Sequence, residues 1–397
     1  MLFVRSENLT PNMRLAKPIY NKTGVLLYER DSKITSTIIS SISNFGLIGV
    51  YILEPAEPVP PLSAEDIEFE KNQTVFVFSY KESLDSLKNG KLSDKFNPLV
   101  EQIIKIYGSL NHPINFVQNM RSPDDYVYKH GVSVAILCAL ISKYLKLDYR
   151  YQKTLISAAF LSNFGNLFIP DNIARKGTWL SANDKELIQI AMEKGLDYLK
   201  QQDKKLLFPI DAIDLVEYYI LSTSNDKIKP KPSKMNEYLS NILKVANAFD
   251  QLTAMNINHT PLSDVTAMKF LYAEQNKYSK KIVDALSKVI HIMPKGACID
   301  LTTGDAAIVL EENNENFMKP VILRLIDNKI YDLNDPRTYK YIQIYDSMKT
   351  MDNRIKFDDD TLKQFQSDPY LNSMLSKFKR SSWTIYFNHF SIHSQIK

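Results

Sequence analysis

The stretch HGVSVAILCALISKYLK, residues 130–146, decides the fold class, because its apolar residues recur at intervals of three and four positions. That spacing is typical of an α-helix with an apolar face. Six further stretches repeat it, at residues 98–109, 151–163, 183–200, 211–222, 236–252 and 261–274. We therefore predict a mainly α protein built around an all-helical domain at residues 64–292.

The region before this domain has a different pattern. Residues 1–53 contain short alternating runs, one amphipathic stretch at 34–45 and a strand at 49–53. This combination predicts a small β-rich N-terminal module with one helix. Four prolines fall within residues 55–61. Because proline interrupts both helices and central strands, we predict a linker at residues 54–63.

The region after the helical domain is also β-rich. Strand patterns occur at residues 297–301, 306–310 and 320–325, separated by turn-forming residues. They predict a β-rich C-terminal extension at residues 293–397. Its last part alternates polar and aromatic residues and is predicted to form a terminal aromatic segment.

Composition and charge narrow the possible partners. The chain has 397 residues, 44% of them apolar, which is enough for two or three domains. The 49 basic and 45 acidic residues leave a net charge of only +4, so we expect no nucleic-acid partner. No run of 18 uncharged apolar residues or export signal occurs, and the two cysteines lie far apart. A cytoplasmic protein without a membrane partner is expected.

Four stretches of the helical region carry a resemblance to a known family. They are Tyr126–His130, Ala158–Pro170, Lys176–Ser181 and Lys244–Thr253. Their order and spacing resemble the HD-GYP family, the branch of HD-domain phosphohydrolases that opens cyclic di-GMP, and both flanks resemble modules joined to it. The resemblance implies an HD-type helical fold. It also implies a pocket in which histidines and aspartates hold two or three iron, manganese or similar ions.

Most of the implied metal ligands are replaced in this sequence. The first histidine is kept as His130, and the other seven of the eight positions are Tyr126, Ser162, Asn163, Ala191, Tyr218, Tyr219 and Asn247. A basic loop at residues 224–234 stands in place of the G-Y-P motif. One imidazole does not make a metal site. We therefore predict no bound metal, no cofactor and no catalytic residue.

The replacements predict a packed polar plug in the former cavity. Asn163 and Asn247 can form hydrogen bonds while neutral, and Tyr218 and Tyr219 can fill volume with aromatic area. For His130 we expect a structural role, bonded to a neighbouring backbone group.

Asp250 is expected to stabilise its helix as a hydrogen-bond acceptor. The competing interpretation of the same residues is a rebuilt metal site made of His130, Glu217, Asp226 and Asp250.

The residues that remain suggest three functions. Candidate ligand-binding positions, taken from the resemblance and the basic loop, are Asn166, Lys227, Lys229, Lys231, Asn256 and His259. The first hypothesis is a catalytically inactive HD-GYP-like signalling protein that acts by protein–protein contact in cyclic di-nucleotide signalling, with a homo-oligomer among the possible assemblies. The alternatives are a receptor that binds cyclic di-GMP without cleaving it, and a divergent metal-dependent cyclic di-GMP phosphodiesterase.

Overall fold

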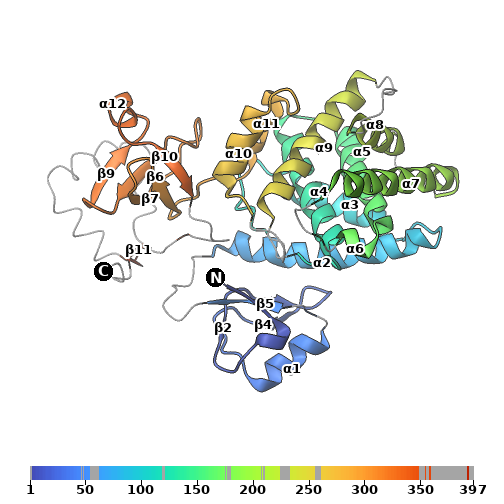
Figure 1. The fold of residues 1–397 in the computed structure, drawn as a ribbon, viewed down its shortest axis with the longest axis horizontal. Coiled ribbons are helices and arrows are strands. Elements are labelled where there is room, and N and C mark those ends of the chain that lie inside the picture. Colours follow the sequence, from blue (N-terminus) through green and yellow to red (C-terminus); the bar gives the residue numbers. More distant parts are fainter. Residues whose placement is uncertain are drawn as a thin grey trace.

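The structure is a computed structural model with a mainly α fold, as predicted, and with sheets in its N- and C-terminal regions (Figure 1). It describes residues 2–45, 47, 49–53, 62–118, 121–174, 176, 180–206, 208, 211–223, 233–254, 261–347, 354, 357–358 and 391–392. In the part described, no helix combines the length and apolar character that a membrane span requires.

The central body is a bundle of helices. Its helices are α2 (Ala64–Lys88), α3 (Phe96–Ile106), α4 (Tyr126–Tyr144), α5 (Tyr149–Leu161), α6 (Asp171–Ala174), α7 (Ala182–Leu206), α8 (Ala212–Thr223), α9 (Lys234–Thr253), α10 (Asp264–Ala273) and α11 (Lys280–Val289), with a 3-10 turn, η2, at Phe164–Phe168. All seven predicted stretches overlap one of these helices. The periodicity did not single out α2, because its buried face includes polar residues, among them Glu70 and Gln73.

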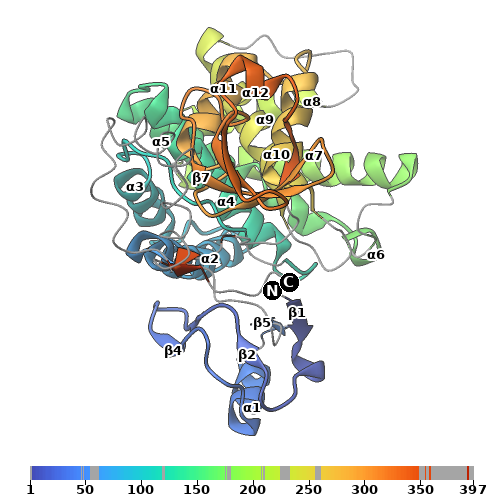
Figure 2. The same cartoon turned by 90° about the vertical axis from the view of Figure 1, so that its left-hand side faces the viewer.

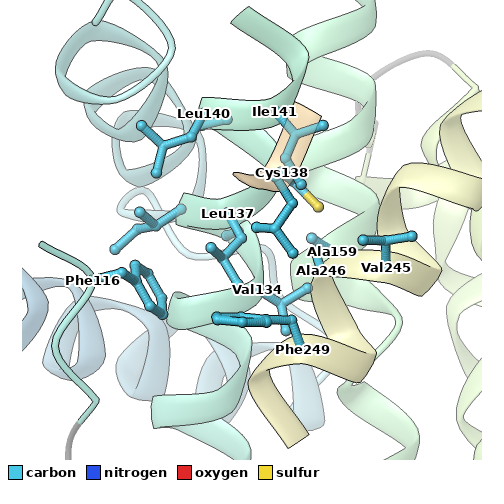
Figure 3. Packing of buried hydrophobic residues seen from close by; sticks show 14 of the residues in the cluster. Phe116, Val134, Leu137, Cys138, Leu140, Ile141, Ala159, Val245, Ala246 and Phe249 are labelled. Atoms are coloured by element: carbon cyan, nitrogen blue, oxygen red, sulfur yellow. The ribbon is translucent and has the colours of Figure 1, made fainter. Parts of the chain in front are cut away.

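Helix α4 lies at the centre of the bundle. Every residue from His130 to Ser142 is buried, so this helix is enclosed on all sides rather than amphipathic. Figure 3 shows Val134, Leu137 and Cys138 of α4 near Ala246 and Phe249 of α9. The buried contact between α4 and α9 fixes the relative position of the two helices that carry the site.

A close approach of α2 to α4 depends on a glycine. A Cβ atom at Gly131 would lie 2.4 Å from Cε1 of Tyr80, so only glycine leaves room for this ring. The Tyr80 hydroxyl donates a hydrogen bond of 2.6 Å to the Phe160 carbonyl oxygen. Tyr80 therefore ties α2 to α5 across the face of α4.

The N-terminal module has its own small core. Its elements are β1 (Leu2–Arg5), the 3-10 turn η1 (Ser6–Asn8), β2 (Arg14–Leu15), β3 (Ile19–Tyr20), β4 (Leu26–Tyr28), α1 (Ser36–Asn44) and β5 (Gly49–Leu53). Strands β1, β5 and β2 form an antiparallel sheet, and Leu15, Ile34 and Ile42 fill the space beneath α1. Both views place the module against the side of α2 (Figures 1 and 2).

The C-terminal extension is an antiparallel sheet in the order β10-β6-β7-β8-β9. Its elements are β6 (Cys298–Leu301), β7 (Ala306–Glu311), β8 (Val321–Arg324), β9 (Lys329–Asp332), α12 (Pro336–Tyr339) and β10 (Ile344–Ser347). Ile299, Val309 and Ile322 belong to the same apolar core as the helices. Two short strands, β11 (Phe357–Asp358) and β12 (Ser391–Ile392), pair with each other, and the rest of the predicted aromatic segment lies outside the described residues.

Candidate functional site

His130 lies in a buried polar cluster between α4 and α9. Its Nδ1 is 2.5 Å from Oδ2 of Asp250, and its Nε2 is 2.9 Å from Oδ1 of Asn247. The expectation that His130 meets a backbone group is therefore wrong, because both ring nitrogens meet side chains of α9. Asp250 and Asn247 are three positions apart, so one face of the helix presents both.

Arg121, in the segment before α4, supplies the cation of this cluster. Its Nη1 donates to Oδ2 of Asp250 at 2.5 Å, and its Nη2 donates to Oδ1 at 2.6 Å. Both side chains are almost fully buried, with 1% and 0% of their surfaces exposed. A bidentate guanidinium–carboxylate pair of this kind combines charge with a fixed geometry.

Gln118 and Ser133 complete the hydrogen bonding around the pair. The Gln118 amide donates to Oδ1 of Asp250 at 3.2 Å and to the Thr253 hydroxyl at 2.9 Å, while its oxygen accepts from Nη2 of Arg121 at 2.9 Å. Ser133 on α4 accepts from the same Nη2 at 3.2 Å. The expectation that Asp250 serves its own helix is also wrong, because its partners come from the segment before α4 and from α4 itself.

The charges within the cluster set the state of the carboxyl group. Burial alone raises the pKa of Asp250, but the Arg121 charge and the hydrogen bonds from Arg121 and His130 outweigh burial and hold this pKa well below its usual range. The Asp250 charge likewise raises the pKa of Arg121 against the effect of burial. Asp250 is therefore expected to be an anion at neutral pH.

Tyr126, one turn before His130, covers one side of the cluster. Its ring stacks on the imidazole with 5.1 Å between centroids and an interplanar angle of 16°. The Arg121 guanidinium lies 5.8 Å from the centroid of the same ring. Burial raises the pKa of Tyr126 to about 12, so its hydroxyl stays protonated. An aromatic ring stands here where the family resemblance implies an acidic ligand.

Ser162 and Asn163, where the family resemblance implies a His-Asp pair, bond back to the last turn of α5. Both are buried, and both side chains donate to the Ala159 carbonyl oxygen, at 3.1 Å and 2.8 Å. Asn166 donates to the Asn163 side-chain oxygen at 3.2 Å. Among the described residues, no hydrogen bond joins these three side chains to the Asp250 cluster.

Three other replaced positions lie on α7 and α8. Ala191 is buried where α7 packs on η2. Tyr219 is half-buried, and its pKa is raised by burial and by the nearby Cys138, Tyr278 and Tyr126. Tyr218 lies beneath Lys244, with 5.9 Å between Nζ and the ring centroid.

The remaining candidate positions cannot be placed. Lys227, Lys229, Lys231, Asn256 and His259 lie outside the described residues, as does Asp226. Glu217, another member of the rebuilt metal site, forms an ion pair of 2.7 Å with Lys200. Of the three members of that hypothesis that the structure describes, it brings His130 and Asp250 together and pairs Glu217 with Lys200.

The donor atoms of this cluster do not fit a divalent ion. Both oxygens of Asp250 accept from Arg121, and both nitrogens of His130 have partners. Within the described residues, no three His, Cys, Asp or Glu side chains gather in a way that could hold a metal. A cation entering here would have to displace a guanidinium that is already bound through two hydrogen bonds. The arrangement ties α4, α9 and the segment before α4 together through buried hydrogen bonds.

Sequence reasoning missed Arg121 and Gln118. Asp250 gave an available signal, because it shares the buried stripe of α9 with Ala246, Phe249 and Thr253. A carboxylate on an apolar stripe needs a cationic or hydrogen-bonding partner. That signal predicts a partner without naming it, since Arg121 lies 129 positions away in the chain.

Comparison with known proteins finds a family match in the helical region. A family model described as HD domain matches residues 116–282, which include the Arg121–Asp250 cluster and most of the helical bundle. The match and the helical fold together support an HD-type domain at residues 116–282.

The chain is also similar to a cyclic di-GMP phosphodiesterase, PA4108, of Pseudomonas aeruginosa. The two are 20% identical over 213 residues, which cover 53% of this chain and 51% of that protein. The chain thus spans about half the length of the curated relative it matches. This similarity agrees with the predicted HD-GYP resemblance.

Proposed function

We propose that this chain is a catalytically inactive HD-domain protein of cyclic di-GMP signalling that acts through protein contact. The similarity to a cyclic di-GMP phosphodiesterase supports the signalling context. The proposal of inactivity depends on the Arg121–Asp250 pair. In this pair the Arg121 guanidinium binds the Asp250 carboxylate that lies beside His130, where the family resemblance implies that a metal ion would bind. A fold that keeps its core without a metal site remains useful as a binding surface.

Metal content and turnover test the proposed inactivity. The purified full-length chain, incubated with manganese or ferrous iron and then desalted, is expected to retain far less than one metal ion per chain. It is also expected to leave cyclic di-GMP intact, because no metal-bound hydroxide can form. Stoichiometric metal together with hydrolysis would overturn the proposal and favour the divergent phosphodiesterase. Calorimetric titration of the same preparation with cyclic di-GMP tests the receptor alternative. Binding without cleavage would favour that alternative over a protein that acts only by protein contact.

The proposed contact surface is the part of α8 and α9 that carries Tyr218 and Lys244. Lys244 lies one turn before Asn247, so this surface adjoins the His130 cluster. A half-buried tyrosine under a lysine combines apolar area with charge, as interface residues often do.

Substitution at Tyr218 tests this contact. Affinity capture with the wild-type chain is expected to retain an enzyme of cyclic di-nucleotide turnover, and Tyr218→Ser is expected to reduce that retention at least about tenfold, since interface aromatic residues carry much of the binding energy. Tyr341→Ser is the matched control, because Tyr341 is 70% exposed on the C-terminal extension. Equal retention by both variants would refute this surface as the contact.

A further inference from the structure

Lys17 of the N-terminal module reaches the segment that holds the cluster. Its Nζ lies 3.4 Å from the Gln118 carbonyl oxygen and 3.2 Å from Oε1 of Glu70 on α2. Its side chain is only 12% exposed. The same ammonium lies 5.4 Å from the centroid of the Tyr51 ring on β5, which anchors Lys17 to its own module.

The segment that Lys17 contacts is buried, and hydrogen bonds from two parts of the molecule hold its carbonyl groups. Gln73 of α2 donates to the Val117 carbonyl oxygen at 3.3 Å, and Lys17 donates to the next carbonyl along the chain. Two consecutive carbonyls are therefore held by two different parts of the molecule. The Gln118 side chain then bonds Arg121, Asp250 and Thr253. A continuous series of hydrogen bonds thus leads from the N-terminal module to His130.

The ion pair between Lys17 and Glu70 makes the contact between Lys17 and α2 depend on whether the N-terminal module is docked. Glu70 is buried, and its second oxygen, Oε2, has no hydrogen-bond partner among the described residues. If the module moves away, the Glu70 carboxylate loses its cation and must turn toward water. A shift of α2 at this point also changes Gln73, which lies one turn further along the same helix.

We propose that the N-terminal module is a regulatory input to the Arg121–Asp250–His130 cluster, and that Lys17 transmits its docking by fixing residues 116–118. With the module docked, Gln118 is held so that it orients both members of the ion pair. With the module displaced, the segment loses the hydrogen bond to the Gln118 carbonyl oxygen and the cluster loosens. The inference rests on the proposed signalling function, in which the state of the HD-domain surface carries the signal.

The test compares Lys17→Met with the control Lys22→Met. Lys22 is exposed in the same module, and no contact of its side chain is described. Side-chain nitrogen resonances of Arg121 and His130 in the full-length protein give the readout. Lys17 forms no described contact with either residue, so an effect of the substitution on them must pass through intervening residues such as Gln118. The Lys17→Met variant is expected to shift or broaden both sets of resonances, and the control is expected to leave them unchanged.

A second variant covers the case in which Lys17→Met folds poorly. Glu70→Gln keeps the shape of the side chain and removes the ion pair, so it should change the Arg121 and His130 resonances in the same direction. If Lys17→Met or Glu70→Gln shows wild-type resonances for Arg121 and His130, the proposed transmission from the N-terminal module to the cluster is wrong. This outcome is distinct from failure of the proposed function, which is decided by metal content and hydrolysis and does not depend on these resonances.

Discussion

Replacing Arg121 by methionine is expected to lower the free energy of unfolding by about 3–5 kcal/mol, the loss typical when one partner of a buried ion pair is removed. Methionine keeps much of the volume but leaves the Asp250 carboxylate buried without its bidentate partner. Chemical denaturation of the purified variant measures the effect. A loss below about 1 kcal/mol would show that the pair contributes little to the fold.

Two variants control this measurement. Arg150→Met removes an ion pair with Asp211 whose side chains are 63% and 41% exposed, and it is expected to cost less than about 1 kcal/mol. The double variant Arg121→Met, Asp250→Asn removes both buried charges. It should recover part of the stability lost in Arg121→Met, because a neutral amide costs less to bury than an unpaired carboxylate.

The same pair gives the stability a defined dependence on pH. Because the folded state holds the pKa of Asp250 well below its usual range, the carboxylate contributes its full stabilisation above the unfolded value of about 3.9. That contribution is lost as the pH falls below about 4 toward the depressed folded value. The wild type should therefore lose stability more steeply in acid than Arg121→Met does.

Replacing Gly195 by alanine is the second substitution with a large expected effect. We expect it to lower the free energy of unfolding, whereas helix propensity alone would raise it. Alanine in place of glycine within a helix ordinarily stabilises by about 1 kcal/mol. Here a Cβ atom at Gly195 would lie 2.5 Å from Cα and 2.7 Å from the backbone nitrogen of Gly165. Backbone atoms cannot turn aside as a flexible side chain can, so α7 would have to move away from η2.

We expect Gly195→Ala to destabilise the protein by about 2–3 kcal/mol, in the range of overpacked cores. Thermal and chemical unfolding measure the change. Asp197→Ala, two positions further along α7 and exposed, is the control and should remain within about 0.5 kcal/mol of the wild type. Equal or higher stability in Gly195→Ala would mean that the two backbones can separate at little cost.

Much of the fold follows from local patterns in the sequence. The periodicity of residues 130–146 predicts α4, and the alternating runs of residues 1–53 predict the module built from β1, β2, α1 and β5. These predictions succeed because one buried face imposes its spacing on the elements that carry it. α2 was not singled out, since Glu70 and Gln73 interrupt its apolar stripe and are buried through contacts with Lys17 and Val117.

The site was predictable only in part. The sequence by itself determined which residue types stand near His130 in the chain, and the family resemblance implies that a histidine and an aspartate are missing there. Only the tertiary structure decided which side chains surround His130. Arg121 and Asp250 lie 129 positions apart, and their pairing depends on how α4 and α9 pack. The spacing of residues within one segment cannot predict a contact that forms only when distant segments pack together.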